Sequence, residues 1–226
     1  AVLESVAELT LAVLRSRPDG VEALPFRGVA LRRLAQLASW AGQDPRPQLA
    51  EAVGCFKHAL RLHPNHDDAL NNLGLALLEQ GLYEMERGQD PRPALQEAVA
   101  GFERAAAISP RFSLLGNLGV AWWAIGHYES GRGIDPRPSL DHARNALNRA
   151  LGINPQDWSA LNNLGLAGCE EVQWLLASGH DAEPALVSAL DALERSLARN
   201  PDNGGTYTNL GAAWRLRASA ATDPEA

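Results

Sequence analysis

A short motif, Gly-x-Asp-Pro-Arg-Pro, recurs along the chain at nearly constant spacing. Its three full copies start at Gly42, Gly88 and Gly133, and a divergent copy starts at Gly179. The aspartates at the third position of the four copies are 46, 45 and 46 residues apart. A fixed period of this length is typical of stacked supersecondary units, each of which buries its apolar face against its neighbours. The period therefore predicts a repeat array rather than one globular core.

Each copy of the motif combines a helix end with a helix start. Glycine can take the left-handed conformation that closes a helix at its C-terminus. Aspartate can accept a backbone N–H at the start of the next helix, and proline suits the first helical position. Two helices joined so tightly must fold back antiparallel. The arginines Arg46, Arg92 and Arg137 have no local role in this interpretation, and we expect them either to pair with a neighbouring acid or to form a basic edge.

Apolar residues after each motif predict the buried face of a second helix. In the first copy they are Leu49, Ala52, Phe56 and Ala59, at positions i, i+3, i+7 and i+10. The later copies place residues in the same register: Leu95, Ala98, Phe102 and Ala105; Leu140, Ala143, Leu147 and Ala150; Leu186, Ala189, Leu193 and Ser196.

A second motif, Asn-Leu-Gly, marks the helix that precedes each turn. Its glycines are Gly74, Gly119, Gly165 and Gly211, spaced 45, 46 and 46 residues apart, and Gly28 has the same phase one unit earlier. A glycine inside a helix costs about 1 kcal/mol relative to alanine. Its recurrence at one phase predicts close approach by a neighbouring helix.

These signals predict an all-α protein, with residues 1–226 forming one array of antiparallel helix hairpins. The expected elements are a lone second helix over 2–17, hairpins over roughly 21–63, 67–109, 112–154 and 158–200, and a lone first helix over 203–220. Because the pattern opens and closes within a unit, we expect the chain to be a fragment of a longer protein.

The two motifs together resemble the tetratricopeptide repeat (TPR), whose pattern is W-x2-L-G-x2-Y, then A-x3-F, then P. Leu73-Gly74, Ala98-x3-Phe102 and Pro110 follow that pattern. The resemblance implies a right-handed superhelical solenoid whose first helices line a concave groove. The period here is longer by 11–12 residues. Since about three helical turns span 11 residues, both helices can lengthen without turning their buried faces away. Leu37, Tyr83, Tyr128 and Trp174, each seven residues before the aspartate, are expected to extend those faces.

The long form of the repeat also resembles repeats found beside bacterial serine/threonine protein kinase domains. No kinase motif occurs in this chain.

The resemblance places the candidate binding residues on the first helices, in the groove. Asparagine side chains can donate to and accept from a peptide backbone, and apolar side chains stand where the family's carboxylate clamp has basic residues, which favours an apolar or amphipathic ligand. Trp123 could act as an aromatic anchor. Alternatively, the asparagines bond neighbouring helices and Trp123 lies in the core. The candidate groove residues are Asn71, Asn72, Leu75, Asn117, Val120, Trp123, Asn162, Asn163, Leu166 and Asn209.

Composition and charge limit the kinds of partner and cofactor that we expect. The net charge of -7 argues against nucleic acid or an anionic membrane, and no apolar run is long enough to span a bilayer. Cys55 and Cys169 fall in predicted helices, so we expect no disulfide and a reducing, cytoplasmic location. His58, His63 and His66 do not predict a metal site, because His58 and His63 lie on different helix faces and Pro64 intervenes. We expect no cofactor and no catalytic site.

Three functions fit these features. The leading hypothesis is a non-catalytic scaffold that holds a peptide or helical segment of a partner protein. The second is a regulatory or dimerisation module of an attached serine/threonine kinase, and the third is a structural spacer. Apolar faces left open at the two ends could also cause end-to-end self-association.

Overall fold

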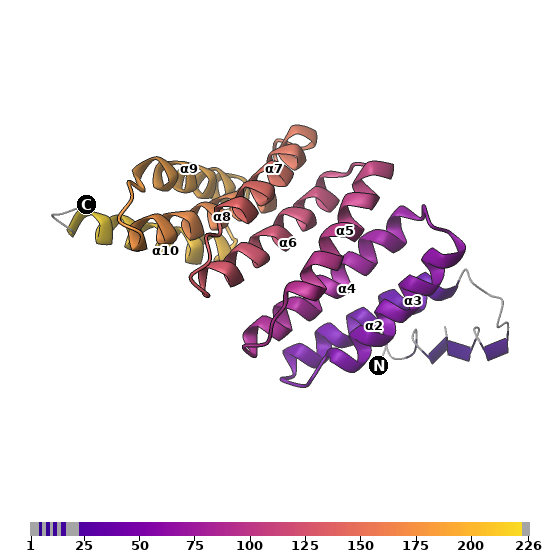
Figure 1. The fold of residues 1–226 in the computed structure, drawn as a ribbon. Coiled ribbons are helices and arrows are strands. Elements are labelled where there is room, and N and C mark those ends of the chain that lie inside the picture. The colour runs from indigo at the N-terminus through magenta and orange to yellow at the C-terminus, as the bar shows by residue number, and fades with distance from the viewer. Residues whose placement is uncertain (1–4, 6–7, 10, 13–14, 17–22, 223–226) are drawn as a thin grey trace. The chain divides into compact units, whose positions relative to one another are not determined.

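The computed structural model describes residues 5, 8–9, 11–12, 15–16 and 23–222. Within these residues the chain is helical and contains no strand. Most of the helix expected over residues 2–17 lies outside the described residues. The helices, labelled as in Figure 1, are α2 (Ala23–Trp40), α3 (Arg46–Leu62), α4 (Asp67–Glu86), α5 (Arg92–Ile108), α6 (Phe112–Ser130), α7 (Arg137–Ile153), α8 (Trp158–Ala177), α9 (Glu183–Arg199) and α10 (Gly204–Thr222).

The chain forms two compact units, residues 1–110 and residues 111–226. Unit 1 contains the hairpins α2–α3 and α4–α5, and unit 2 contains the hairpins α6–α7 and α8–α9 followed by α10. The two helices of each hairpin run antiparallel, side by side (Figure 1). The even-numbered helices α2 to α10 are the first helices of the repeat, and the odd-numbered helices α3 to α9 are the second helices.

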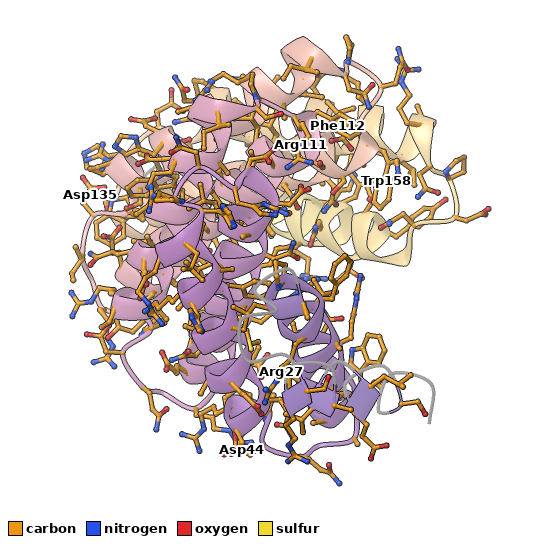
Figure 2. The ribbon with its side chains drawn as sticks, turned by 90° about the vertical axis from the view of Figure 1, so that its right-hand side faces the viewer. Arg27, Asp44, Arg111, Phe112, Asp135 and Trp158 are labelled. Atoms are coloured by element: carbon orange, nitrogen blue, oxygen red, sulfur yellow. The ribbon has the colours of Figure 1, made fainter. Side chains whose placement is uncertain are left out.

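The turn chemistry expected from the motif is confirmed. Gly42, Gly88, Gly133 and Gly179 have φ between 67° and 71°, the left-handed conformation that ends a helix. At the first turn, which Asp44 marks in Figure 2, the carboxylate accepts the backbone N–H of Arg46 at 3.0 Å. Proline between these two residues already has helical dihedrals, φ -82° and ψ -10°.

The arginine of the motif does have a local role, so the interpretation that it has none is wrong. Arg46 Nε lies 2.9 Å from Asp44 Oδ1, and Arg46 Nη2 lies 2.6 Å from Oδ2, which makes a bidentate pair. The same pair forms between Arg92 and Asp90 and between Arg137 and Asp135. The expected alternative, pairing with a neighbouring acid, is confirmed. One aspartate therefore caps the helix and binds the guanidinium two residues later.

The buried faces of the second helices are confirmed. All sixteen residues expected on these faces are buried, from Leu49 at 1 % exposure to Ser196 at 0 %. Ser196 is the single polar member, and its hydroxyl donates to the backbone carbonyl of Trp158 at 2.7 Å.

The glycines of the first helices lie directly under these faces, as expected. A Cβ built on Gly74 would lie 2.6 Å from the ring of Phe102, and one on Gly119 would lie 2.5 Å from Leu147 Cγ. Since real Cβ atoms do not come so close to another side chain, glycine is required for the two helices to pack at this separation.

The expectation that all four residues preceding the turn are buried is wrong for Leu37, which is 44 % exposed, and for Trp174, which is partly exposed. Their repeat-equivalents Tyr83 and Tyr128 are buried. Tyr83 packs beneath Arg46 of the preceding hairpin, whose guanidinium carbon lies 5.5 Å from the ring centre.

Within each unit the first helices lie closer together than the second helices do. In unit 2, α8 contacts both α6 and α10, whereas no Cα atoms of α7 and α9 come within 8 Å of each other. The same holds in unit 1, where α2 contacts α4 but no Cα atoms of α3 and α5 come within 8 Å of each other, and the two second helices meet through the Lys57–Glu97 ion pair, 2.7 Å long. In unit 2 the separated second helices leave a pocket of about 160 Å³ over α8. The first helices therefore form the inner side of each unit, which we call the first-helix face.

Candidate functional site

All ten candidate groove residues are partly exposed and lie on first helices. Unit 1 holds three of them on α4, and unit 2 holds seven on α6, α8 and α10. By helix they are Asn71, Asn72 and Leu75; Asn117, Val120 and Trp123; Asn162, Asn163 and Leu166; and Asn209.

In unit 2 the structure brings three of the asparagines together. Asn209 Nδ2 of α10 donates to Asn162 Oδ1 of α8 at 3.1 Å, and Asn162 Nδ2 points to Asn163 Oδ1 at 3.4 Å. These asparagines therefore connect neighbouring helices, as the alternative interpretation has it. The series is open at both ends, because Asn163 Nδ2 and Asn209 Oδ1 have no hydrogen-bond partner among the described residues.

In unit 1, Asn72 makes one hydrogen bond within its own helix. Its Nδ2 donates to the backbone carbonyl of Asp68 at 2.8 Å. That bond fixes the amide and leaves Asn72 Oδ1 as an acceptor without a partner in the described part of the chain.

Asn72 lines an apolar pocket of about 580 Å³, on the first-helix face of unit 1. Its polar rim is fixed at His66, whose Nδ1 accepts the backbone N–H of Ala69 at 3.3 Å and caps α4. Phe26 of α2 forms one wall and is 71 % exposed. The residues that line this pocket are Pro25, Phe26, Val29, Ala59, His63, His66, Asp68 and Asn72.

Sequence reasoning missed the α2 side of this pocket, although the repeat contains the signal. Phe26 and Val29 stand 46 residues before Asn72 and Leu75, so they are the repeat-equivalents of two candidate groove residues. An aromatic residue takes the place of the recurring asparagine only in this copy. The pocket thus includes one repeat position on α2 and the same position on α4, and the C-terminal end of α3 completes it with Ala59 and His63.

A second polar cluster links α6 to α8 in unit 2. His127 Nδ1 lies 2.7 Å from Glu170 Oε2, and the Trp123 ring stacks on His127 with ring centres 5.4 Å apart. Glu170 is buried and His127 is half exposed. The hydrogen bond to Glu170 raises the pKa of His127, although burial opposes this effect. Trp122, which directly precedes Trp123, stacks instead on His142 of α7, with ring centres 4.4 Å apart.

The equivalent position in unit 1 carries a similar link between first helices. Glu79 of α4 stands where α8 has Glu170, and its Oε1 accepts from Arg32 Nη1 at 2.6 Å and from Gln36 Nε2 at 2.5 Å. These links depend on the register between adjacent first helices, which the sequence pattern does not specify.

The described residues contain no group of three or more His, Cys, Asp or Glu side chains able to hold a metal ion. Among those residues, no helix has both the length and the apolar character needed to cross a bilayer. Cys55 and Cys169 are free and buried, and burial raises the pKa of the Cys169 thiol to about 11. Neither thiol is therefore poised as a nucleophile.

The fold and the first-helix face define a helical repeat protein. Residues 55–87 match the family model described as tetratricopeptide repeat, over the second half of α3 and the whole of α4. A comparison with curated protein sequences gave no match.

Several solved structures share the fold. TTC0263, a thermophilic TPR protein of Thermus thermophilus, is 17% identical, with 94% of this chain and 91% of that chain covered and a TM-score of 0.56. YrrB, a TPR protein, is 17% identical, with coverage of 97% and 87% and a TM-score of 0.54. MamA is 18% identical, with coverage of 84% and 82% and a TM-score of 0.52. The chain thus has the fold of a tetratricopeptide-repeat array, in a long-period form, and its residues 55–87 match the family model.

Proposed function

We propose that the chain is a non-catalytic protein-interaction scaffold, which binds an extended or helical segment of a partner protein on its first-helix face. The observation that carries this proposal is the apolar pocket of unit 1. Its volume of about 580 Å³ suits one or two large apolar side chains. Phe26 and Val29 supply apolar contact, and Asn72 Oδ1 supplies an acceptor for a backbone N–H.

Unit 2 offers polar contacts on its own first-helix face. Asn163 Nδ2 can donate to a peptide carbonyl and Asn209 Oδ1 can accept from a peptide N–H. Leu166 of α8 and Val120 of α6 are partly exposed and add apolar surface. An amphipathic segment, with large apolar side chains at intervals, suits the first-helix face of either unit. YrrB, a TPR protein with an unusual peptide-binding site, shares the fold, which supports a peptide ligand.

Selection from a random peptide display library tests the proposal. Peptides selected on the intact chain are expected to bind at least tenfold more weakly to Phe26→Ala and to the double variant Asn163→Ala/Asn209→Ala. Asn148→Ala is the matched control, because Asn148 is an exposed asparagine on α7, beside the pocket between the second helices. Peptides that lose affinity only for the control variant would contradict the first-helix face as the binding site.

The resemblance of the motif to kinase-associated bacterial repeats favours one alternative, a module that regulates or dimerises an attached serine/threonine kinase. Joining the chain to such a kinase domain tests it. Under this alternative the Phe26→Ala and Asn163→Ala substitutions change phosphorylation of a generic substrate without any added peptide, whereas under the scaffold proposal they do not. A structural spacer would bind no peptide at all.

A further inference from the structure

The pocket between the second helices of unit 2 lies beside a glycine, at a position where the other described first helices carry a large apolar side chain. Gly168 of α8 lines this pocket, whose volume is about 160 Å³. A Cβ on Gly168 would meet Ala189 Cβ at 2.8 Å, so α9 packs on the glycine itself and the pocket opens next to it. The residues at this repeat position on α2, α4, α6 and α10 are Leu31, Leu77, Trp122 and Trp214.

In unit 1 larger side chains stand at the equivalent positions. Leu77 of α4 is 4 % exposed, and Lys57 of α3 forms an ion pair of 2.7 Å with Glu97 of α5. Each of these three residues has a smaller counterpart 91 residues later, and all three counterparts line the pocket of unit 2. They are Gly168, Asn148 and Ser188. The pocket is therefore open because a covering side chain and a bridging ion pair are both replaced.

An aromatic ring fills the equivalent place one repeat earlier. Trp122 and His142 stand 46 residues before Gly168 and Ser188. Their rings stack with centres 4.4 Å apart. Since Gly168 and Ser188 both line the pocket, it takes the place of that aromatic stack.

The pocket has an apolar floor and a polar rim. Leu164 of α8 lines it and is partly exposed, whereas its unit 1 equivalent Leu73 is 6 % exposed. Ala167, also of α8, is buried beside it. Asn148 of α7 and Ser188 of α9 are exposed, and neither side chain has a hydrogen-bond partner in the part of the chain that the structure describes.

The charged side chains that line the pocket balance one another. Arg144 Nη1 donates to Glu171 Oε2 at 2.6 Å, and Arg195 Nη1 donates to Asp191 Oδ2 at 3.0 Å. Arg144 also pairs with Asp141, which lies outside the lining. A charged ligand would therefore leave its own charge unpaired in this pocket. The Glu171 side chain is 15 % exposed, and its Oε1 has no partner among the described residues, so it can accept from one neutral donor.

We propose that this pocket binds the side chain of a tyrosine from a partner protein. The phenol ring lies over Leu164 and Gly168, where the repeat before has an aromatic stack, and its hydroxyl donates to Glu171 Oε1. Asn148 and Ser188 bond to the partner's backbone at the rim, because an amide and a hydroxyl can each donate and accept. A ring that carries its donor at the tip reaches the floor while its backbone stays outside.

The site goes beyond the proposed function and does not rest on it, because it lies among the second helices and not on the first-helix face. A library-selected peptide that used this pocket would lose affinity for Asn148→Ala and keep its affinity for Phe26→Ala. The two sites are therefore distinguishable by the same pair of variants.

N-acetyl-tyrosinamide is the direct probe, because its blocked backbone resembles one residue within a protein chain. It is titrated into the isotopically labelled intact chain, and the backbone amide signals are followed by NMR. We expect saturable shifts at Gly168 and Ala192, which line the pocket, and none at Gly152, an exposed residue of α7 outside it. N-acetyl-phenylalaninamide, which lacks the hydroxyl, should bind at least threefold more weakly.

A double variant rebuilds the ion pair of unit 1 across the pocket. Asn148→Lys/Ser188→Glu is expected to weaken binding of N-acetyl-tyrosinamide at least fivefold. The matched control is Asn145→Lys/Val187→Glu, which adds the same two charges at exposed positions of α7 and α9 that do not line the pocket. It should leave the affinity within twofold of the wild-type chain.

Any of three results would overturn the proposal. They are absence of saturable shifts up to the solubility limit of N-acetyl-tyrosinamide, equal affinity for the wild-type chain and Asn148→Lys/Ser188→Glu, and equal affinity for the tyrosine and phenylalanine probes. Free 4-methylphenol is titrated in parallel. Binding of this phenol without binding of N-acetyl-tyrosinamide would also overturn the proposal, because the pocket would then take a free small molecule and not a side chain of a protein.

Discussion

At the residue scale, the aspartate of the repeated motif has two roles in one turn. Asp44 accepts the N–H of Arg46 and also binds its guanidinium, and these bonds hold the pKa of the Asp44 carboxyl at about 2. Both residues are exposed. The pair therefore orders the turn and does not leave the arginine available as a simple basic edge.

The close approach at Gly119 gives the first prediction. Gly119→Ala is expected to lower the free energy of unfolding by about 1–3 kcal/mol relative to Gly116→Ala, because the new Cβ would lie 2.5 Å from Leu147 Cγ and 3.3 Å from the Ala143 carbonyl oxygen. Gly116 is in the same helix, with nothing within 4 Å, so the comparison cancels the helix propensity of alanine. Urea unfolding measures both variants. Equal stabilities would show that the two helices are not in this contact.

The His127–Glu170 pair gives a pH-dependent prediction. Since the folded-state pKa of His127 is raised, its stabilising contribution is complete below about pH 6.5 and is lost as the pH rises through the folded-state value. We expect the stability difference between the wild-type chain and His127→Gln to be about 1 kcal/mol or less at pH 5.5, because the histidine is half exposed, and to shrink by pH 8.5.

Urea unfolding at pH 5.5 and pH 8.5 measures the stability difference between the wild-type chain and His127→Gln. The control is the same substitution made in a chain that carries Glu170→Gln. There the effect of His127→Gln should no longer depend on pH. A difference that grows with pH in the wild-type background would contradict the assigned direction of the pKa shift.

At the scale of the helices, the hairpin turn depends on one left-handed residue. Gly133→Ala is expected to lower the unfolding free energy by about 1–2 kcal/mol, because alanine is strained at φ 70° although its Cβ would meet nothing within 4 Å. Gly133→Asn should lower the unfolding free energy by less than Gly133→Ala does, since asparagine tolerates the left-handed conformation better. Thermal or urea unfolding of the two variants distinguishes backbone strain from crowding. A larger loss of unfolding free energy in Gly133→Asn than in Gly133→Ala would contradict backbone strain as the cause.

Much of the structure at the scale of the helices could be predicted from the sequence, because the copies of the repeat can be compared with one another. The turn glycines, the buried faces headed by Leu49 and the glycine contacts of α4 and α6 all follow from local geometry. The apolar pocket and the His127–Glu170 link could not be predicted in the same way, because they depend on how adjacent first helices are displaced along each other. The predicted burial of Leu37 was wrong for a related reason. Its repeat-equivalent Tyr83 is covered by Arg46 of the neighbouring hairpin, a contact that local geometry does not predict.

At the scale of the molecule, the structure describes two compact units, each with its own first-helix face. Unit 1 contributes the apolar pocket and unit 2 contributes the open asparagine series. Phe26→Ala separates binding from folding, because Phe26 is 71 % exposed. We expect its unfolding free energy to stay within about 0.5 kcal/mol of the wild-type chain, while the affinity for a selected peptide falls. A large loss of stability in this variant would show that Phe26 is a structural residue.

Photo-crosslinking tests the binding face most directly. A photoreactive benzoylphenylalanine is placed at Phe26, or separately at Val187, an exposed apolar residue of α9 among the second helices, and each chain is irradiated with a library-selected peptide. The proposed function predicts crosslinked peptide with the probe at position 26 and none with the probe at position 187. Crosslinking from position 187 alone would contradict it.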